Sequence, residues 1–121
     1  MDLSLDELKS KFERVELAAT LQCSGNRRNE LAAVKPIKGL SWDSGAISTA
    51  IWAGARLSDV LAAAGLTEAG AGGAGVAHVH FVGLDADADG TTYAASVPAE
   101  RALDPKCDVL LAYEMNGRHE G

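Results

Sequence analysis

Long apolar runs are missing from this sequence. No stretch of it approaches the roughly 18 consecutive apolar residues that a membrane-spanning helix needs. The N-terminal segment, MDLSLDELKSKFE, has neither the apolar core of a secretory signal nor the arginine-rich character of a transit peptide. We therefore expect no membrane contact, and no targeting segment can be read from the sequence.

Basic residues and cysteines are both scarce. Eleven lysines and arginines stand against seventeen aspartates and glutamates, which gives a formal net charge of -6. Because the one basic feature that stands out is the local pair Arg27 and Arg28, no nucleic-acid partner is expected. The two cysteines, Cys23 and Cys107, lie far apart without C-x-x-C spacing, which argues against a disulfide framework or a zinc knuckle and favours a reducing compartment.

What is present is sufficient for one folded domain. The chain has 121 residues, and 47% of them are apolar, which is enough for a hydrophobic core. Ser4 and Glu7 have the spacing of a capping box and predict the start of an amphipathic helix over residues 5–12. The β-branched and apolar segment over residues 15–22 predicts a strand that ends at Cys23.

The remaining chain predicts an alternation of helices, loops and strands. Pro98 opens the segment PAERAL at a position suited to the first residue of a helix. Asn116-Gly117 is a strong signal for a hairpin turn, and because few residues follow it, we expect its partner strand to be missing and the domain to be truncated. The other expected elements are a helix over 57–64 with Gly65 as its C-terminal glycine, a Gly/Ala-rich loop over 67–75, and strands over 76–82, 91–97 and 108–115.

The segment TLQCSGNRRNE places a cysteine and two arginines at a turn. Nearby guanidinium groups favour a thiolate, which is both a nucleophile and a soft metal ligand, and arginine also binds oxyanions through its planar fork. Cys23 with Arg27 and Arg28 therefore indicates a site for a metal and an oxyanion. The structural alternative is that Cys23 is a small buried residue and that the arginines pair with carboxylates such as Glu30.

Three other groups of residues give weaker signals. DADADG begins like a calcium loop, but Ser96 takes the place of the required glutamate and strands flank the segment, so an acidic turn is expected. His78 and His80 share one face of a strand without a third ligand nearby, which favours exposure or polar packing. Cys107 is expected in the core, and Trp42 is either a core aromatic or the wall of a cleft.

Three long blocks of sequence carry a family resemblance. They are TLQCSGNRRNE, then VKPIKGLSWDSGAISTAIWAGARLSDVL, then HVHFVGLDADADGTTYAASVPAERALDPKCDVLLAYEMNG. In this order they resemble successive parts of the molybdenum-cofactor domain of the sulfite oxidases, from Leu3 to Gly117. The resemblance implies an α+β, mixed-sheet molybdopterin-binding fold of the sulfite-oxidase type, with residues 1–121 as an incomplete domain.

Four residues receive roles from this resemblance. Cys23 is implied to be the protein thiolate on molybdenum, beside the dithiolene sulfurs of the pterin. Arg28 is implied to face the active site and to hold the sulfite or sulfate anion, whereas Arg27 would form a structural ion pair. Trp42 matches the tryptophan that shapes the substrate pocket, and Asp85 matches a residue that contacts the pterin cofactor.

The implied activity is molybdenum-dependent oxidation of sulfite to sulfate, with the molybdenum-molybdopterin cofactor and no haem indicated. Cytochrome c or dioxygen would accept the electrons, and a domain absent from this chain would form a homodimer. The mitochondrial intermembrane space or the peroxisome is the implied location. Two alternatives stay open: the molybdenum domain of an assimilatory nitrate reductase, which shares the cysteine and the GNRR block, and a non-catalytic truncated remnant.

Overall fold

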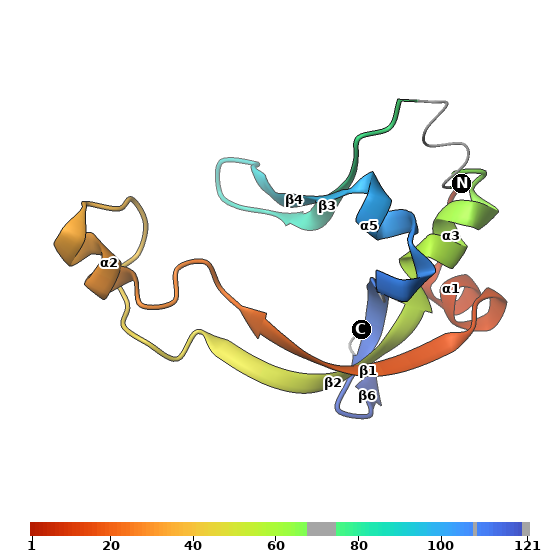
Figure 1. Ribbon diagram of the computed structural model, residues 1–121, viewed down its shortest axis with the longest axis horizontal. Helices are drawn as coiled ribbons and strands as arrows, with labels where there is room; N and C mark the ends of the chain where they lie inside the picture. Colours follow the sequence, from red (N-terminus) through yellow and green to blue (C-terminus); the bar gives the residue numbers. More distant parts are fainter. Residues whose placement is uncertain (68–74, 108, 120–121) are drawn as a thin grey trace. The chain divides into compact units, whose positions relative to one another are not determined.

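The computed structural model of the chain describes residues 1–67, 75–107 and 109–119. It contains short helices and two sheets, which confirms the predicted α+β class (Figure 1). No helix in these ranges is long and apolar enough to cross a membrane. In chain order the elements are α1 (Leu5–Lys11), β1 (Arg14–Gln22), α2 (Arg28–Val34), β2 (Ile47–Arg56), α3 (Leu57–Ala63), β3 (His78–Ala86), β4 (Thr92–Pro98), α5 (Ala99–Leu103), the 3-10 helix η1 (Pro105–Cys107), β5 (Leu110–Met115) and β6 (Arg118–His119).

The chain folds into two compact units. The first unit comprises Met1–Val15 and Gly54–Ala112, and the second comprises Glu16–Ala53 and Tyr113–Gly121. One sheet has the strand order β1-β2-β5-β6, and the other pairs β3 with β4. The helices α1, α3 and α5 and the β3–β4 pair belong to the first unit, whereas α2 belongs to the second.

Helix α1 begins with the predicted capping box. The Glu7 backbone N–H donates to Ser4 Oγ over 3.2 Å, and the Ser4 backbone N–H donates to Glu7 Oε2 over 3.0 Å. Lys11 Nζ lies 2.7 Å from the other Glu7 carboxylate oxygen. The hydrogen bonds from Lys11 and Ser4, in that order of effect, lower the pKa of Glu7 from 4.5 to about 2. Phe12, the last residue of the predicted helix, is instead the C-cap, with an extended backbone.

The core of the first unit forms where α5 packs against α3, β3 and β4 (Figure 1). Ala99 and Leu103 are buried there, and Leu61, Leu66 and Val76 pack against them. Helix α5 begins at Ala99, one residue later than predicted, because Pro98 still pairs with His78 as the last residue of β4. Pro98 is therefore the N-cap of the helix and not its first residue.

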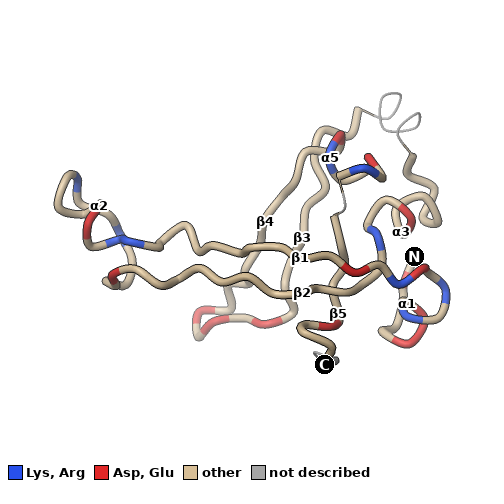
Figure 2. Tube along the Cα trace, turned by 60° about the horizontal axis from the view of Figure 1, so that its bottom comes forward, with Lys and Arg blue, Asp and Glu red and all other residues tan. Residues whose placement is uncertain are grey.

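The predicted strand pair β3–β4 is antiparallel, with His78 opposite Pro98 and Val82 opposite Ala94. Strand β3 extends to Ala86, beyond its predicted end. The turn that follows is closed by Asp87, whose Oδ1 accepts hydrogen bonds from the backbone N–H groups of Asp89 and Thr91 over 3.0 and 2.8 Å. This is the predicted acidic turn, and its aspartates are red in Figure 2.

The predictions for His78 and His80 are confirmed, whereas the prediction for Cys107 is not. His78 and His80 are exposed, as predicted. Cys107 does not lie in the core: it is half-buried in η1, where its Sγ donates to Asp104 Oδ2 over 3.3 Å and Arg101 Nη1 lies 3.7 Å from the sulfur. The prediction was wrong because the apolar strand begins only at Leu110, after this polar cluster. The expected strand start at position 108 and most of the expected 67–75 loop lie outside the described residues.

Strand β2 was not predicted from the sequence, and close packing against β5 explains its single glycine. The segment ISTAIWAGAR is rich in alanine and contains Gly54, so its β signal is weak. A Cβ at Gly54 would overlap the Leu111 carbonyl oxygen and lie 2.7 Å from the Ala112 Cα. Only glycine therefore allows this approach of the β2 backbone to β5.

The Asn116-Gly117 hairpin turn is confirmed. Both residues have left-handed backbones, with φ values of 52° and 74°, as a tight turn between antiparallel strands requires. The expectation of a missing partner strand was wrong, because the two-residue strand β6 pairs antiparallel with the end of β5. Asn116 also joins the turn to β2: its N–H donates to the Ile51 carbonyl over 2.7 Å, and its Oδ1 accepts from the Ile51 N–H over 3.0 Å.

Candidate functional site

Cys23 lies where β1 ends and the chain turns, as predicted. Its backbone N–H donates to the Ala46 carbonyl over 2.9 Å, and its carbonyl accepts from the Asn26 N–H over the same distance. The side chain is exposed, so the interpretation of Cys23 as a buried apolar residue was wrong. The Gly25 N–H points at the sulfur, with 3.4 Å between the nitrogen and Sγ. The thiol is therefore oriented by a turn and open to a ligand.

The two neighbouring arginines have different partners. Arg27 has a left-handed backbone with φ of 64° and is the N-cap of α2. Its guanidinium binds Glu30 Oε2 through Nε, over 3.0 Å, and through Nη2. This hydrogen bond holds the pKa of Glu30 below its ordinary value and raises that of Arg27. The predicted structural ion pair of Arg27 is thus confirmed.

Arg28 is half-buried and is held without a carboxylate. Its Nη1 donates to the Leu40 carbonyl over 2.6 Å, and its Cζ lies 4.7 Å from the centroid of the Trp42 ring. Within the described ranges it forms no ion pair. A carbonyl dipole and an aromatic face stabilise the cation without neutralising it, so its charge remains available to an anion.

A ladder of hydrogen bonds joins the GNRRN turn to the segment around Trp42. The backbone N–H groups of Arg27 and Asn29 donate to the carbonyls of Asp43 and Trp42 over 2.9 and 3.1 Å. Asn29 Nδ2 also donates to Asp43 Oδ1 over 2.8 Å, and the Trp42 indole N–H donates to the Gly25 carbonyl. Trp42 is 37% exposed, so it borders solvent and is not a core aromatic.

Asn26 completes this connection, and the sequence did not point to it. Its Oδ1 accepts hydrogen bonds from the backbone N–H groups of Gly45 and Ala46, each over 3.1 Å. Asparagine in a turn is a signal for side-chain bonds to nearby backbone, but here the bonded backbone lies 19 and 20 residues away. Asn26, Asn29 and Asp43 are thus supporting residues whose roles only the folded chain reveals.

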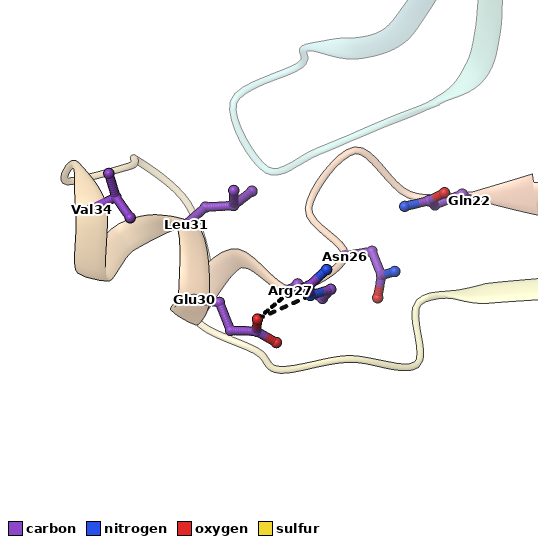
Figure 3. A pocket seen from close by; sticks show the side chains of 6 residues that line it. All are labelled: Gln22, Asn26, Arg27, Glu30, Leu31 and Val34. Carbon is purple, nitrogen blue, oxygen red and sulfur yellow. Dashed lines mark hydrogen bonds and ion pairs between the residues drawn. The ribbon is translucent and has the colours of Figure 1, made fainter.

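An open pocket of about 420 Å³ lies beside α2 (Figure 3). The Arg27–Glu30 pair forms part of its lining, together with the exposed Leu31 and Val34. Its full lining is Gln22, Asn26, Arg27, Glu30, Leu31 and Val34. Cys23, Arg28 and Trp42 do not line it, so the structure separates this pocket from the predicted site residues.

Three of the four predicted site residues belong to one unit. Cys23, Arg28 and Trp42 lie in the second unit, where the GNRRN turn and the hydrogen-bond ladder place them. Asp85 lies in the first unit, near the end of β3, where it is exposed and lines an open pocket of about 480 Å³ with Asp87 and Tyr93. Among the described residues, no three His, Cys, Asp or Glu side chains form a group that could hold a metal ion.

Comparison with known proteins gives consistent matches over the chain. A family model described as the oxidoreductase molybdopterin binding domain matches residues 1–119. The chain is 60% identical to sulfite oxidase of Gallus gallus over 117 residues, which cover 97% of the chain and 25% of that protein. It is 58% identical to mitochondrial sulfite oxidase of Homo sapiens over 120 residues, covering 98% of the chain and 21% of that protein. These matches confirm the resemblance seen in the sequence blocks.

Two further matches are more distant. NADH nitrate reductase 2 of Arabidopsis thaliana is 40% identical over 121 residues, covering 98% of the chain and 13% of that protein. The crystal structure of the sulfane dehydrogenase SoxCD from Paracoccus pantotrophus matches with a TM-score of 0.62 and 24% identity, covering 97% of the chain and 26% of that structure's chain. The structural match supports the fold. The chain spans about a quarter or less of the length of the curated relatives described here.

Proposed function

Because the chain belongs to the oxidoreductase molybdopterin-binding domain family, we propose that it is part of an enzyme that oxidises sulfite to sulfate with a molybdenum cofactor. The observation that carries the proposal is the pairing, in one turn, of an exposed thiol with a half-buried arginine that forms no ion pair among the described residues. The higher identity to sulfite oxidases than to the nitrate reductase favours sulfite as substrate.

Cys23 fits the role of the protein ligand to molybdenum. A thiolate is a soft metal ligand, and the Cys23 side chain is exposed at the end of β1. The Cys23 backbone is held by two hydrogen bonds, one to the Ala46 carbonyl and one from the Asn26 N–H. The described residues contain no group of three ligating side chains, so Cys23 would be joined on the metal by donors of the pterin. When bound, the molybdenum cofactor supplies oxygen-atom transfer and takes up the two electrons that sulfite loses.

Arg28 is proposed to bind and orient the oxyanion. Its hydrogen bonds within the described chain use Nη1 alone, so Nε and Nη2 remain as donors for oxygen atoms of the anion. Charge-assisted hydrogen bonds of this kind are about twice as strong as neutral ones, and the planar guanidinium fixes the direction of approach. Trp42 would border the bound oxyanion on one side, because its ring lies against Arg28 and its indole N–H donates to the Gly25 carbonyl.

Asp85 is proposed to contact the pterin. Its carboxylate is exposed at the end of β3, where it can accept hydrogen bonds from the N–H groups of a heterocycle. We expect Asp85→Asn in the full-length natural protein to lower the bound pterin per polypeptide while leaving the circular dichroism spectrum unchanged. Asp89→Asn, which alters the neighbouring acidic turn, is the matched control and should retain the wild-type pterin content.

The central experiment compares Cys23→Ala and Cys107→Ala with the wild type, each as full-length natural protein. We expect the wild type to contain molybdenum and to reduce an artificial electron acceptor when sulfite is added. Cys23→Ala should lose activity because the protein ligand is gone, whereas Cys107→Ala should keep it. A wild type with molybdenum but without sulfite oxidation would refute the proposal, and reduction of nitrate in its place would favour the nitrate reductase alternative.

The proposal extends to the partners and the location of the enzyme. Cytochrome c or dioxygen is the proposed electron acceptor, and a homodimer formed through further polypeptide is the proposed assembly. The human and Drosophila melanogaster relatives are both named mitochondrial sulfite oxidase, which supports a mitochondrial location. Acceptor specificity in a sulfite assay, mass measurement in solution and cell fractionation test these three points separately.

A further inference from the structure

The guanidinium of Arg28 is bordered by two glycines from different parts of the chain. A Cβ placed on Gly39 would lie 2.5 Å from Arg28 Nη1 and 2.9 Å from its Cζ. A Cβ placed on Gly25 would lie 2.9 Å from the same Cζ and 2.8 Å from Trp42 Cζ2. Real Cβ atoms essentially never come within 3.0 Å of another group, so either methyl group would force the arginine or the indole to move.

Two more contacts surround the same group. Leu40 presents its carbonyl to Nη1 at 2.6 Å, and the Trp42 ring lies 4.7 Å from the guanidinium carbon. Hydrogen bonds between the GNRRN turn and residues 42–46 hold the two backbone segments that contribute these contacts. The guanidinium therefore lies between two glycines, one carbonyl and one aromatic ring.

We propose that Gly25 and Gly39 are positioning residues that fix the Arg28 guanidinium for oxyanion binding. This inference rests on the proposed function, in which Arg28 binds sulfite and sulfate. A methyl group at position 39 displaces Nη1 from the Leu40 carbonyl, and the arginine then has to be ordered again by each anion that binds. The loss of preorganisation weakens anion binding even though the charge of Arg28 is retained.

Gly45 provides a matched control for Gly39. Both glycines have positive φ, 110° at Gly45 and 121° at Gly39, so alanine strains the backbone at either position. A Cβ at Gly45 would meet nothing within 4 Å, whereas a Cβ at Gly39 would meet the Arg28 side chain. The two alanine variants therefore share the backbone penalty and differ in their effect on the arginine.

The test uses the full-length natural protein loaded with its cofactor, and it measures the Kd for sulfate by calorimetry together with kcat and KM for sulfite. Gly39→Ala should weaken sulfate binding and raise the KM by about tenfold or more relative to Gly45→Ala, with a smaller change in kcat. In an Arg28→Ala background, adding Gly39→Ala or Gly45→Ala should give equal sulfate affinities, because the residue through which Gly39 acts is gone.

The outcomes separate this inference from the proposed function. If the wild type oxidises sulfite and binds sulfate but Gly39→Ala matches Gly45→Ala, the positioning role is refuted and the function stands. If Gly39→Ala still weakens sulfate binding in the Arg28→Ala background, it acts by another route and the inference is also refuted. A loaded wild type that neither binds sulfate nor oxidises sulfite would overturn the proposed function itself. If Gly39→Ala fails to fold, Gly25→Ala gives a second measurement, because Gly25 does not have a positive φ and its Cβ would also meet the Arg28 side chain.

Discussion

Replacing Arg28 by glutamine removes one positive charge while leaving an amide that can still donate a hydrogen bond. In the structure this arginine donates to the Leu40 carbonyl and faces the Trp42 ring, and within the described ranges no carboxylate pairs with it. Arg28→Gln should therefore act mainly on the affinity for sulfite. Because Arg27 has the same chemistry but is bound to Glu30, Arg27→Gln is the natural control.

The size of the effect follows from the contacts. A hydrogen bond to a charged group contributes about 1.5–3 kcal/mol, which at about 1.4 kcal/mol per factor of ten corresponds to a KM for sulfite raised about 10- to 150-fold. The cation–π contact with Trp42 adds about 0.5–1 kcal/mol to the stability of the folded protein, so the free energy of unfolding should fall by a similar amount. Arg28→Gln should therefore cost more free energy in substrate binding than in the stability of the fold.

Steady-state kinetics on the full-length natural protein measure the first effect, and urea denaturation measures the second. Arg27→Gln should change the KM by less than about threefold, because the ion pair that it breaks is on the surface. The reasoning fails if Arg28→Gln leaves the KM unchanged, or if the two variants raise it equally. Equal increases would mean that Arg27 also contributes to anion binding although it is paired with Glu30.

Three further predictions concern stability. Glu7→Gln should lower the Tm at pH 7, because the pKa of Glu7 is lowered from 4.5 to about 2 and the ionised carboxylate therefore stabilises the folded protein at pH values above 4.5. The difference in Tm from wild type should disappear as the pH falls from 4.5 towards 2 and the carboxylate is protonated. Asn26→Ala should lower the free energy of unfolding by about 1–3 kcal/mol, since two hydrogen bonds of about 0.5–1.5 kcal/mol each are lost. Gly54→Ala should lower it by about 1–3 kcal/mol through overpacking against β5.

Each of these three predictions can be tested by a measurement or a control variant. Thermal melts over a pH series test Glu7→Gln, and a difference that persisted at pH 2 would contradict the assigned role of the carboxylate. Asn26→Asp keeps an acceptor oxygen and should retain more stability in urea than Asn26→Ala. Gly83→Ala places a Cβ at an ordinary 3.4 Å from its nearest neighbour, so equal losses at Gly83 and Gly54 would count against the close approach.

Local signals in the sequence were accurate where a few neighbouring residues determine the backbone. The Ser4–Glu7 capping box and the Asn116-Gly117 turn are formed as predicted, because their hydrogen bonds and φ values depend on residues next to one another. Strand β2 was not predicted, because alanine and glycine give a weak strand signal. The strand forms because it pairs with β1 on one side and β5 on the other. Cys107 was misplaced for a different reason: the apolar strand begins only at Leu110, and the cysteine contacts Asp104 and Arg101 a few residues before it.

The sequence by itself determined the family, the position of Cys23 at the end of a strand and the candidate residues Arg28, Trp42 and Asp85, whose roles stay predictions. Only the tertiary structure distinguished the two arginines, one held by Glu30 and the other by the Leu40 carbonyl and an aromatic ring. The physical reason is distance along the chain. A cap or a turn is encoded within a few residues. Gly39, the Leu40 carbonyl and the Trp42 ring, in contrast, lie more than ten residues from Arg28 along the chain, and only folding brings them beside it.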